Sequence, residues 1–200
     1  MFRLALCLDV AGVLCGVAGL PKPATIILAS SAVAIGLALR FAEAPHGQAK
    51  TQGIHPSFPI FARLTYAWLI GAGSMSVWAA FADLNGGIWG ASRHALTVGF
   101  AATMVFAIGP RILPHFAGVQ NIFSKRLMFL SLLCLQTGCL LRVCSEPLAY
   151  EGLVSLAWKV LPVSGMLELS AVLIFATNLG LTFLAGRSAF ALTITAQPTA

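Results

Sequence analysis

The segment from Ser92 to Gly118 constrains the fold of this chain more than any other. Its apolar middle, Ala95 to Ile108, carries no charged residue, and a histidine stands near each end, His94 and His115. A helix rises about 1.5 Å per residue, so the two histidines lie roughly 31 Å apart, close to the thickness of a bilayer's hydrocarbon core. The segment therefore predicts a transmembrane helix with one histidine at each membrane face. Because metal–nitrogen bonds are about 2 Å long, a single ion cannot bind both histidines.

The composition places the rest of the chain in the membrane as well. Hydrophobic residues make up 58% of the 200 residues and charged residues 9%, whereas a soluble domain is roughly 25% charged. A net charge of +6 would suggest nucleic acid in a soluble protein, but here the twelve Lys and Arg residues stand mostly at the ends of apolar segments, where membrane topology places them. We therefore expect an integral membrane protein whose partner is the lipid bilayer and which binds no nucleic acid.

Six apolar segments predict an all-α polytopic membrane protein, a single domain built as a bundle of about six transmembrane helices. The expected spans are 2–20, 24–42, 58–82, 92–114, 125–144 and 165–185. Residues 148–186 would form one helix of about 58 Å, nearly twice the thickness of the core. We therefore expect residues 162–165, which include Pro162, to break it and to leave a short interfacial helix over 149–161 before the last span. The first span reads as a helix rather than a cleaved signal peptide, since Asp9 interrupts its apolar run.

The basic residues predict the orientation of this bundle. Six spans place both termini on one side of the membrane, together with the loops that follow spans two and four. The Lys and Arg residues of that side are Arg3, Arg40, Lys50, Arg63, Arg111, Lys125, Arg126 and Arg187, and those of the other side are Lys22, Arg93, Arg142 and Lys159. The excess of positive charge predicts that both termini are cytoplasmic.

Polar side chains inside the spans are the candidates for a site that uses no cofactor. Asp9 lies about two turns inside the first span; an ion pair with Arg63 or another basic residue is the favoured interpretation, and an ion or proton pathway is the alternative. Glu168 is expected in the first turn of the last span, where free backbone N–H groups hold a carboxylate. Asn178 is expected to form a hydrogen bond to another helix.

The histidines are the candidates for a site that binds a metal or haem. His46, His55 and His115 fall on the predicted cytoplasmic side, where three imidazoles could converge on copper or zinc, and a single axial imidazole suits haem. His94 alone faces the other side. Each histidine taken singly is more often an interfacial polar residue than a ligand. Arg111 either extends its charge to water or binds an anion such as a haem propionate.

Two stretches of the chain resemble the NnrS family of bacterial multi-pass membrane proteins. They are RHALTVGFAATMVFAIGPRILPHFAG, residues 93–118, and LPVSGMLELSAVLIFATNLGLTF, residues 161–183. The resemblance implies a haem- and copper-containing protein of the bacterial cytoplasmic membrane, associated with the nitric oxide response and denitrification. It makes His94 and His115 the best ligand candidates and Arg111 a candidate for a cofactor carboxylate. The chain resembles only the C-terminal half of the family's members. The resemblance therefore implies a truncated product, a separately encoded half, or a subunit whose partner is a second membrane half or subunit.

Two functions of different classes follow from the sequence. In the first, the chain contributes to a haem/copper site, with metal ligands drawn from His94, His115, His46 and His55. In the second, the bundle is a membrane transporter or assembly subunit without a cofactor, and its polar intramembrane residues do the work. The sequence contains no P-loop or H-E-x-x-H pattern and no recognisable catalytic triad, so it predicts no particular enzymatic reaction.

Overall fold

The structure, a computed structural model, describes residues 1–40, 43, 53–116, 118–119 and 121–195, with side chains as far as Gly186. Most of these residues are helical, and none of them forms a strand. The elements in chain order are α1 (Phe2–Val17), α2 (Pro21–Ala38), α3 (Phe58–Ala82), α4 (Gly87–His94), the π-helix η1 (Ala95–Ala102), α5 (Thr103–Phe116), α6 (Lys125–Tyr150) and α7 (Ala157–Thr195). The predicted all-α polytopic class is thereby confirmed.

Five helical segments of the described chain are long and apolar enough to cross a membrane. They cover residues 21–38, 58–82, 87–116, 125–150 and 157–186. Helix α1 precedes them as a 16-residue apolar helix, about 24 Å long and thus shorter than a bilayer core of roughly 30 Å. It ends at Val17 because the chain turns at Gly19, whose φ is 74°, a conformation that glycine adopts at little cost.

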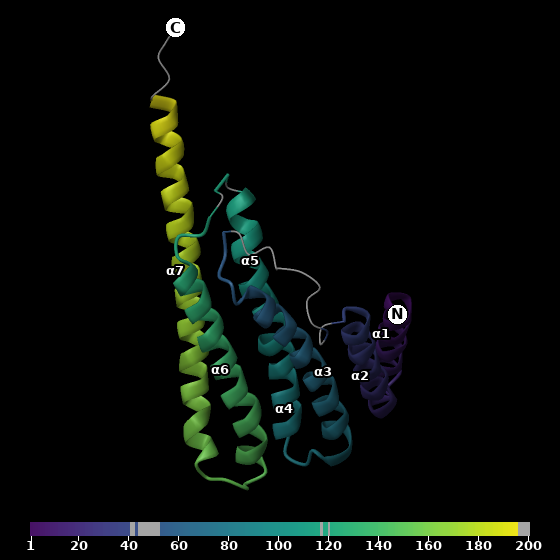
Figure 1. Cartoon of the computed structure of the whole chain (residues 1–200). Coiled ribbons are helices and arrows are strands. Elements are labelled where there is room, and N and C mark those ends of the chain that lie inside the picture. The colour runs from purple at the N-terminus through teal and green to yellow at the C-terminus, as the bar shows by residue number, and fades with distance from the viewer. Residues whose placement is uncertain (41–42, 44–52, 117, 120, 196–200) are drawn as a thin grey trace.

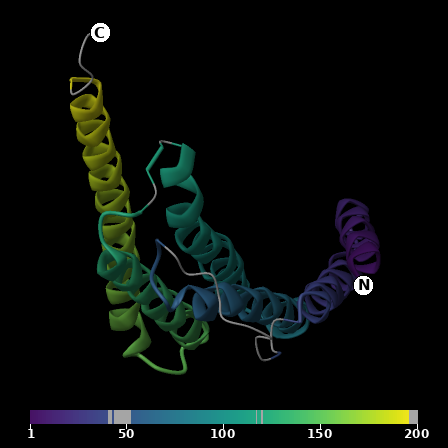
Figure 2. The same cartoon turned by 45° about the horizontal axis from the view of Figure 1, so that its top comes forward.

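The helices stand in a row of antiparallel neighbours (Figures 1 and 2). Helix α1 packs on α2, α2 on α3, α3 on α4 and η1, these two on α6, and α6 on α7. The start of α1, the start of α3 and the end of α7 lie at one end of the bundle, and the short connections 83–86 and 151–156 lie at the other. We call these the terminal end and the hairpin end.

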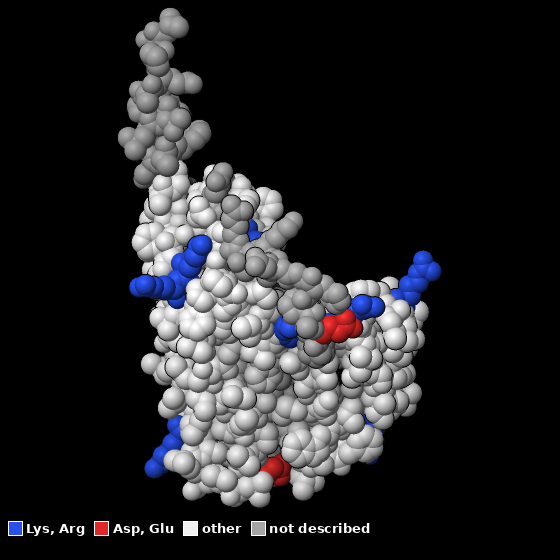
Figure 3. Space-filling model, viewed as in Figure 1, with Lys and Arg blue, Asp and Glu red and all other residues white. Residues whose placement is uncertain are grey.

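The outer surface of the bundle is suited to lipid. On the face shown in Figure 3, Lys, Arg, Asp and Glu lie mainly near the two ends, and the band between them is almost free of charge. Large apolar side chains from several helices are exposed, among them Leu14, Val105 and Leu173. Exposed apolar area on this scale is unfavourable in water and is what a bilayer covers.

The last span begins earlier than its sequence predicts, and the expected interfacial helix over 149–161 is absent. Helix α6 continues to Tyr150, and after a turn at 151–156 helix α7 runs without a break from Ala157 through Pro162. Pro162 lies in the second turn of α7, close to the helix start, so its missing N–H removes little of the hydrogen-bond ladder. The long apolar run is divided instead at Gly152, whose φ of 69° reverses the chain.

The segment around His94 is a continuous helix from Gly87 to Phe116, five residues longer at its start than predicted. Its middle, Ala95–Ala102, is π-helical. The hydroxyl of Thr103 donates to the carbonyl of Val98, five residues earlier (3.1 Å), which matches the wider turn of a π-helix. Short π-helical insertions are frequent at functional sites. The π-helical turns that follow His94 therefore make this residue a candidate for a functional site.

Helices α6 and α7 approach closely at Gly138. A Cβ atom at this position would lie 2.8 Å from Glu168 Cγ and 2.9 Å from the carbonyl oxygen of Ser164. Both distances are shorter than ordinary van der Waals contact, so even a methyl group here would push the two helices apart. Glycine at this position therefore holds Glu168 against α6.

We predict that Gly138→Ala destabilises the protein by roughly 1–3 kcal/mol, because overpacking forces backbone shifts. Gly165→Ala in α7 is the matched control, since a Cβ there meets nothing within 4 Å. The control should be neutral or up to about 1 kcal/mol stabilising, because alanine favours helix over glycine. The measurement is the unfolding midpoint of both variants in detergent. Equal midpoints for the two variants would contradict the close approach at Gly138.

Candidate functional site

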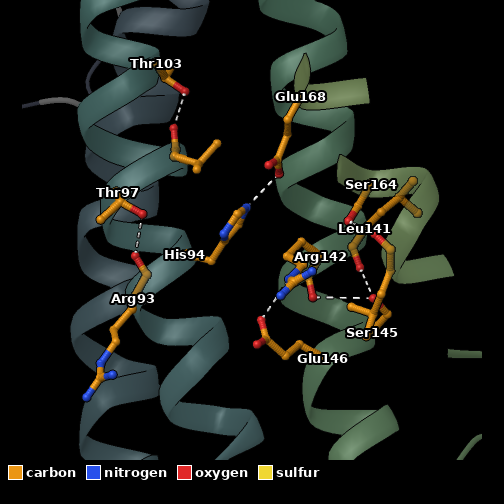
Figure 4. A network of polar contacts seen from close by, with 12 residues as sticks. Arg93, His94, Thr97, Thr103, Leu141, Arg142, Ser145, Glu146, Ser164 and Glu168 are labelled. Atoms are coloured by element: carbon orange, nitrogen blue, oxygen red, sulfur yellow. Dashed lines mark hydrogen bonds and ion pairs between the residues drawn. The ribbon is translucent and has the colours of Figure 1, made fainter. Parts of the chain in front are cut away.

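A histidine and a glutamate from different helices meet inside the bundle. His94 Nε2, at the end of α4, lies 2.6 Å from Glu168 Oε1 of α7 (Figure 4). Their side chains are only 21% and 18% exposed. His94 stands about 10 Å from the start of α4, and Glu168 about 16 Å from the start of α7. The pair therefore lies within the membrane-spanning part of the bundle, nearer to the hairpin end.

A second ion pair lies one helical turn closer to the hairpin end. Arg142 Nε donates to Glu146 Oε2 at 3.1 Å, and the Glu146 side chain is 9% exposed. Both residues belong to α6 and are four positions apart, so they share one face of the helix. Unlike an exposed pair, a buried carboxylate of this kind needs its partner, because an isolated charge in an apolar interior is strongly disfavoured.

The packing of the three helices places the two pairs next to each other. Gly138, Arg142 and Glu146 follow one another along a single face of α6, at intervals of four residues. Glu168 rests against Gly138, and the Glu146 carboxylate fills the space that a side chain at Gly90 of α4 would need. Arg142 therefore lies between the two carboxylates, as Figure 4 also shows.

Glu168 thus differs from its predicted position. The sequence predicts it in the first turn of a helix that begins near Gly165, but α7 begins at Ala157, so Glu168 lies about three turns inside. Free backbone N–H groups at a helix start are out of its reach there. The partner of its carboxylate is the His94 imidazole instead.

Asn178, in contrast, makes the contact that its sequence position predicts. Its side-chain oxygen accepts from the backbone N–H of Ser124 and its amide donates to the Ser124 carbonyl, both at 2.9 Å. Ser124 caps α6 through its own hydroxyl. Asn178 therefore joins α7 to the start of α6, which is a structural use of this buried amide.

Asp9 does not form the predicted ion pair with Arg63. The guanidinium of Arg63 donates to the backbone carbonyl of Glu43 at 2.6 Å, and within the described part of the chain Asp9 has no hydrogen bond or salt bridge. Asp9 instead lines a cavity formed by α1, α2, α3, α4 and η1.

The two other candidate histidines that the structure describes do not lie beside His94. His115 is exposed in the last turn of α5, at the opposite end of the same continuous helix. His55 stacks on Phe129 with 4.8 Å between ring centroids and contacts Ser57 through Nδ1 at 2.7 Å. His46 falls outside the residues that the structure describes.

Arg111 is exposed one turn before His115. Its guanidinium lies over the ring of Phe58, 5.6 Å from the centroid, and no acidic side chain in the described chain pairs with it. The arrangement is compatible both with an arginine that extends to water and with one that binds an anion.

The described residues hold no cluster of potential metal ligands. Across them, no three His, Cys, Asp or Glu side chains gather closely enough to hold a metal ion. The Nε2 atom of His94 is occupied by Glu168, and His115 is roughly 31 Å away along the helix. A cofactor held by His94 would therefore need ligands from outside the described residues or a different arrangement of the imidazole.

Arg142 and Glu146 are not among the site residues that the sequence predicts. Pro147 directly follows Glu146, and the sequence therefore placed Glu146 in a loop. In the structure α6 continues through Pro147 to Tyr150, which puts both residues on one helical face. Their spacing of four residues with opposite charge was the available signal.

Comparison with known proteins assigns the chain to a family but gives it no activity. No curated protein and no solved structure gave a match to this chain. One family model, described as a domain of unknown function (DUF8744), matches residues 2–182 and so covers α1 to the middle of α7. The chain belongs to this family, the DUF8744 family.

Proposed function

We propose that this protein is a membrane transporter without a cofactor, whose cycle exchanges a proton at the His94–Glu168 pair. The observation that carries the proposal is the 2.6 Å contact between His94 Nε2 and Glu168 Oε1 inside two membrane-spanning helices. Ionisable residues are rare in such helices, and those that occur commonly mark ion or proton pathways. Imidazole and carboxylate are also the groups that proton relays use.

The charges around the pair support one mobile proton. Arg142 and Glu146 neutralise each other. With one proton on His94 and Glu168 together, that pair is neutral as well, either as imidazolium and carboxylate or as imidazole and carboxylic acid. Passing the proton between Nε2 and Oε1 keeps the four groups neutral overall, whereas adding or removing one leaves a net charge in an apolar environment. Such an exchange with solvent therefore leaves a transient net charge on the pair, and an applied membrane potential can drive it.

This proposal predicts that Glu168→Gln and His94→Gln stop proton movement. Glutamine keeps the size of glutamate and can form hydrogen bonds, but it cannot bind and release a proton. The measurement uses purified protein in liposomes that contain a pH-sensitive dye, with an inside-negative potential applied. Wild-type vesicles should acidify faster than empty vesicles, and both variants should acidify at the rate of empty ones.

The matched control is Glu43→Gln, which removes an exposed carboxylate that pairs with Arg40. It should keep the wild-type rate. The proposal would be contradicted if wild-type vesicles acidified no faster than empty ones. It would also be contradicted if correctly folded His94 and Glu168 variants acidified the vesicles at the wild-type rate.

The second candidate is the NnrS-like function in the nitric oxide response or denitrification that the resemblance implies. One observation favours it: a metal-bound imidazole commonly contacts a carboxylate through its other ring nitrogen, and His94 has such a carboxylate in Glu168. Haem and copper would then be held by His94 or His115 together with groups of a second membrane half or subunit, with Arg111 near a cofactor carboxylate.

This candidate predicts a haem absorption band in protein purified with a full haem supply, alone or with such a partner. His94→Ala or His115→Ala should abolish the band, and His55→Ala should keep it, since His55 packs on Phe129. If the haem absorption (Soret) band is absent from the protein purified alone and also from the protein purified with such a partner, haem binding is rejected.

We also infer that the terminal end of the bundle faces the cytoplasm of a bacterial inner membrane. The excess of Lys and Arg at that end supports this orientation. It predicts that an alkaline phosphatase fused after Gly152, at the hairpin end, is active, because this reporter folds only outside the cytoplasm. The same reporter fused after Gly118 should be inactive. The reverse pattern would invert the assignment.

A further inference from the structure

A cavity of about 340 Å³ lies between the first two helices and the rest of the bundle. Its walls come from α1, α2, α3, α4 and η1, and they are mostly apolar. Small residues make up much of the lining, among them Ala29, Ala32, Ala72 and Gly73. A volume of this size is within the range of small-molecule sites. The cavity does not include His94 or Glu168, so it is separate from the site described above.

Asp9 is the single acidic residue among the residues that line this cavity. It is partly buried, and the described part of the chain offers it neither a hydrogen bond nor an ion pair. An unpaired carboxylate beside apolar walls interacts weakly with water and strongly with a cation. Trp89 adds an aromatic wall, and its ring already holds a cation, the guanidinium of Arg93, at 6.0 Å.

We propose that this cavity is a binding site for an apolar organic monocation, such as a hydrophobic amine or a quaternary ammonium compound. The carboxylate of Asp9 would neutralise the ligand's charge, and the alanine-rich walls would cover its apolar groups. A strongly hydrated inorganic ion fits these walls poorly, because they offer few polar groups to replace its water. A neutral apolar molecule would leave the Asp9 charge without a partner.

The proposal does not depend on proton exchange at His94 and Glu168. Binding is tested with the whole chain in nanodiscs by equilibrium dialysis against benzyltrimethylammonium. Neopentylbenzene, which has a carbon atom in place of the charged nitrogen, is the neutral comparison, and empty nanodiscs give the partition into lipid. We expect saturable binding of the cation, tighter than that of the neutral compound by at least about tenfold, since an ion pair away from bulk water is weakly screened.

Two variants test the charge of Asp9 and the volume of the cavity separately. Asp9→Asn should lower the affinity for the cation to that for the neutral compound, whereas Glu43→Gln should leave it unchanged. Ser76→Leu should abolish binding of both compounds, because Ser76 lines the cavity. Its control is Ser74→Leu, two residues away on α3, where the serine is exposed and makes the same kind of bond to the carbonyl four residues earlier.

Each outcome bears on the proposal. Binding that persists in both Asp9→Asn and Ser76→Leu, or equal affinity of the wild type for the two compounds, would overturn it. Loss of binding in Ser74→Leu as well would show that the effect of Ser76→Leu is not local, and the charge test at Asp9 would then decide. Absence of saturable cation binding would also overturn it and would leave the proton experiment unaffected, so the two proposals fail separately.

Discussion

The arrangement of α4, α6 and α7 depends on keeping two carboxylates in an apolar interior. A charged side chain away from water is tolerated only beside a partner that offsets its charge. Glu146 has its partner on its own helix, but the partner of Glu168 is on another one. The contact between His94 and Glu168 therefore fixes how α4 and α7 lie relative to each other, with α6 between them.

Glycine makes this arrangement sterically possible. Gly138 and Gly90 stand opposite Glu168 and Glu146, where any side chain would displace the carboxylate. In a bilayer the apolar surfaces of helices gain little by association, so close packing and polar contacts decide which helices pair. Here the same two glycines allow the helices to pack closely and leave space for the polar groups. The packing of the helices and the geometry of the site therefore depend on the same residues.

The broad fold follows from the sequence because apolar length and charge placement dominate membrane insertion. The third span, 58–82, was predicted at the bounds that α3 has. The errors come from proline. The last helix was expected to break at Pro162 and the fifth span to end before Pro147, but α7 runs through Pro162 and α6 runs through Pro147. These two misjudgements moved Glu168 to a helix start, put Glu146 in a loop, and hid the contact with His94.

The π-helix η1 has a position that the sequence did not reveal, since no residue type specifies it. It begins directly after His94, and Leu96, two residues further, lines the Asp9 cavity. Residues two apart point to roughly opposite sides of a helix. One stretch of helix thus has the buried pair on one side and the cavity on the other.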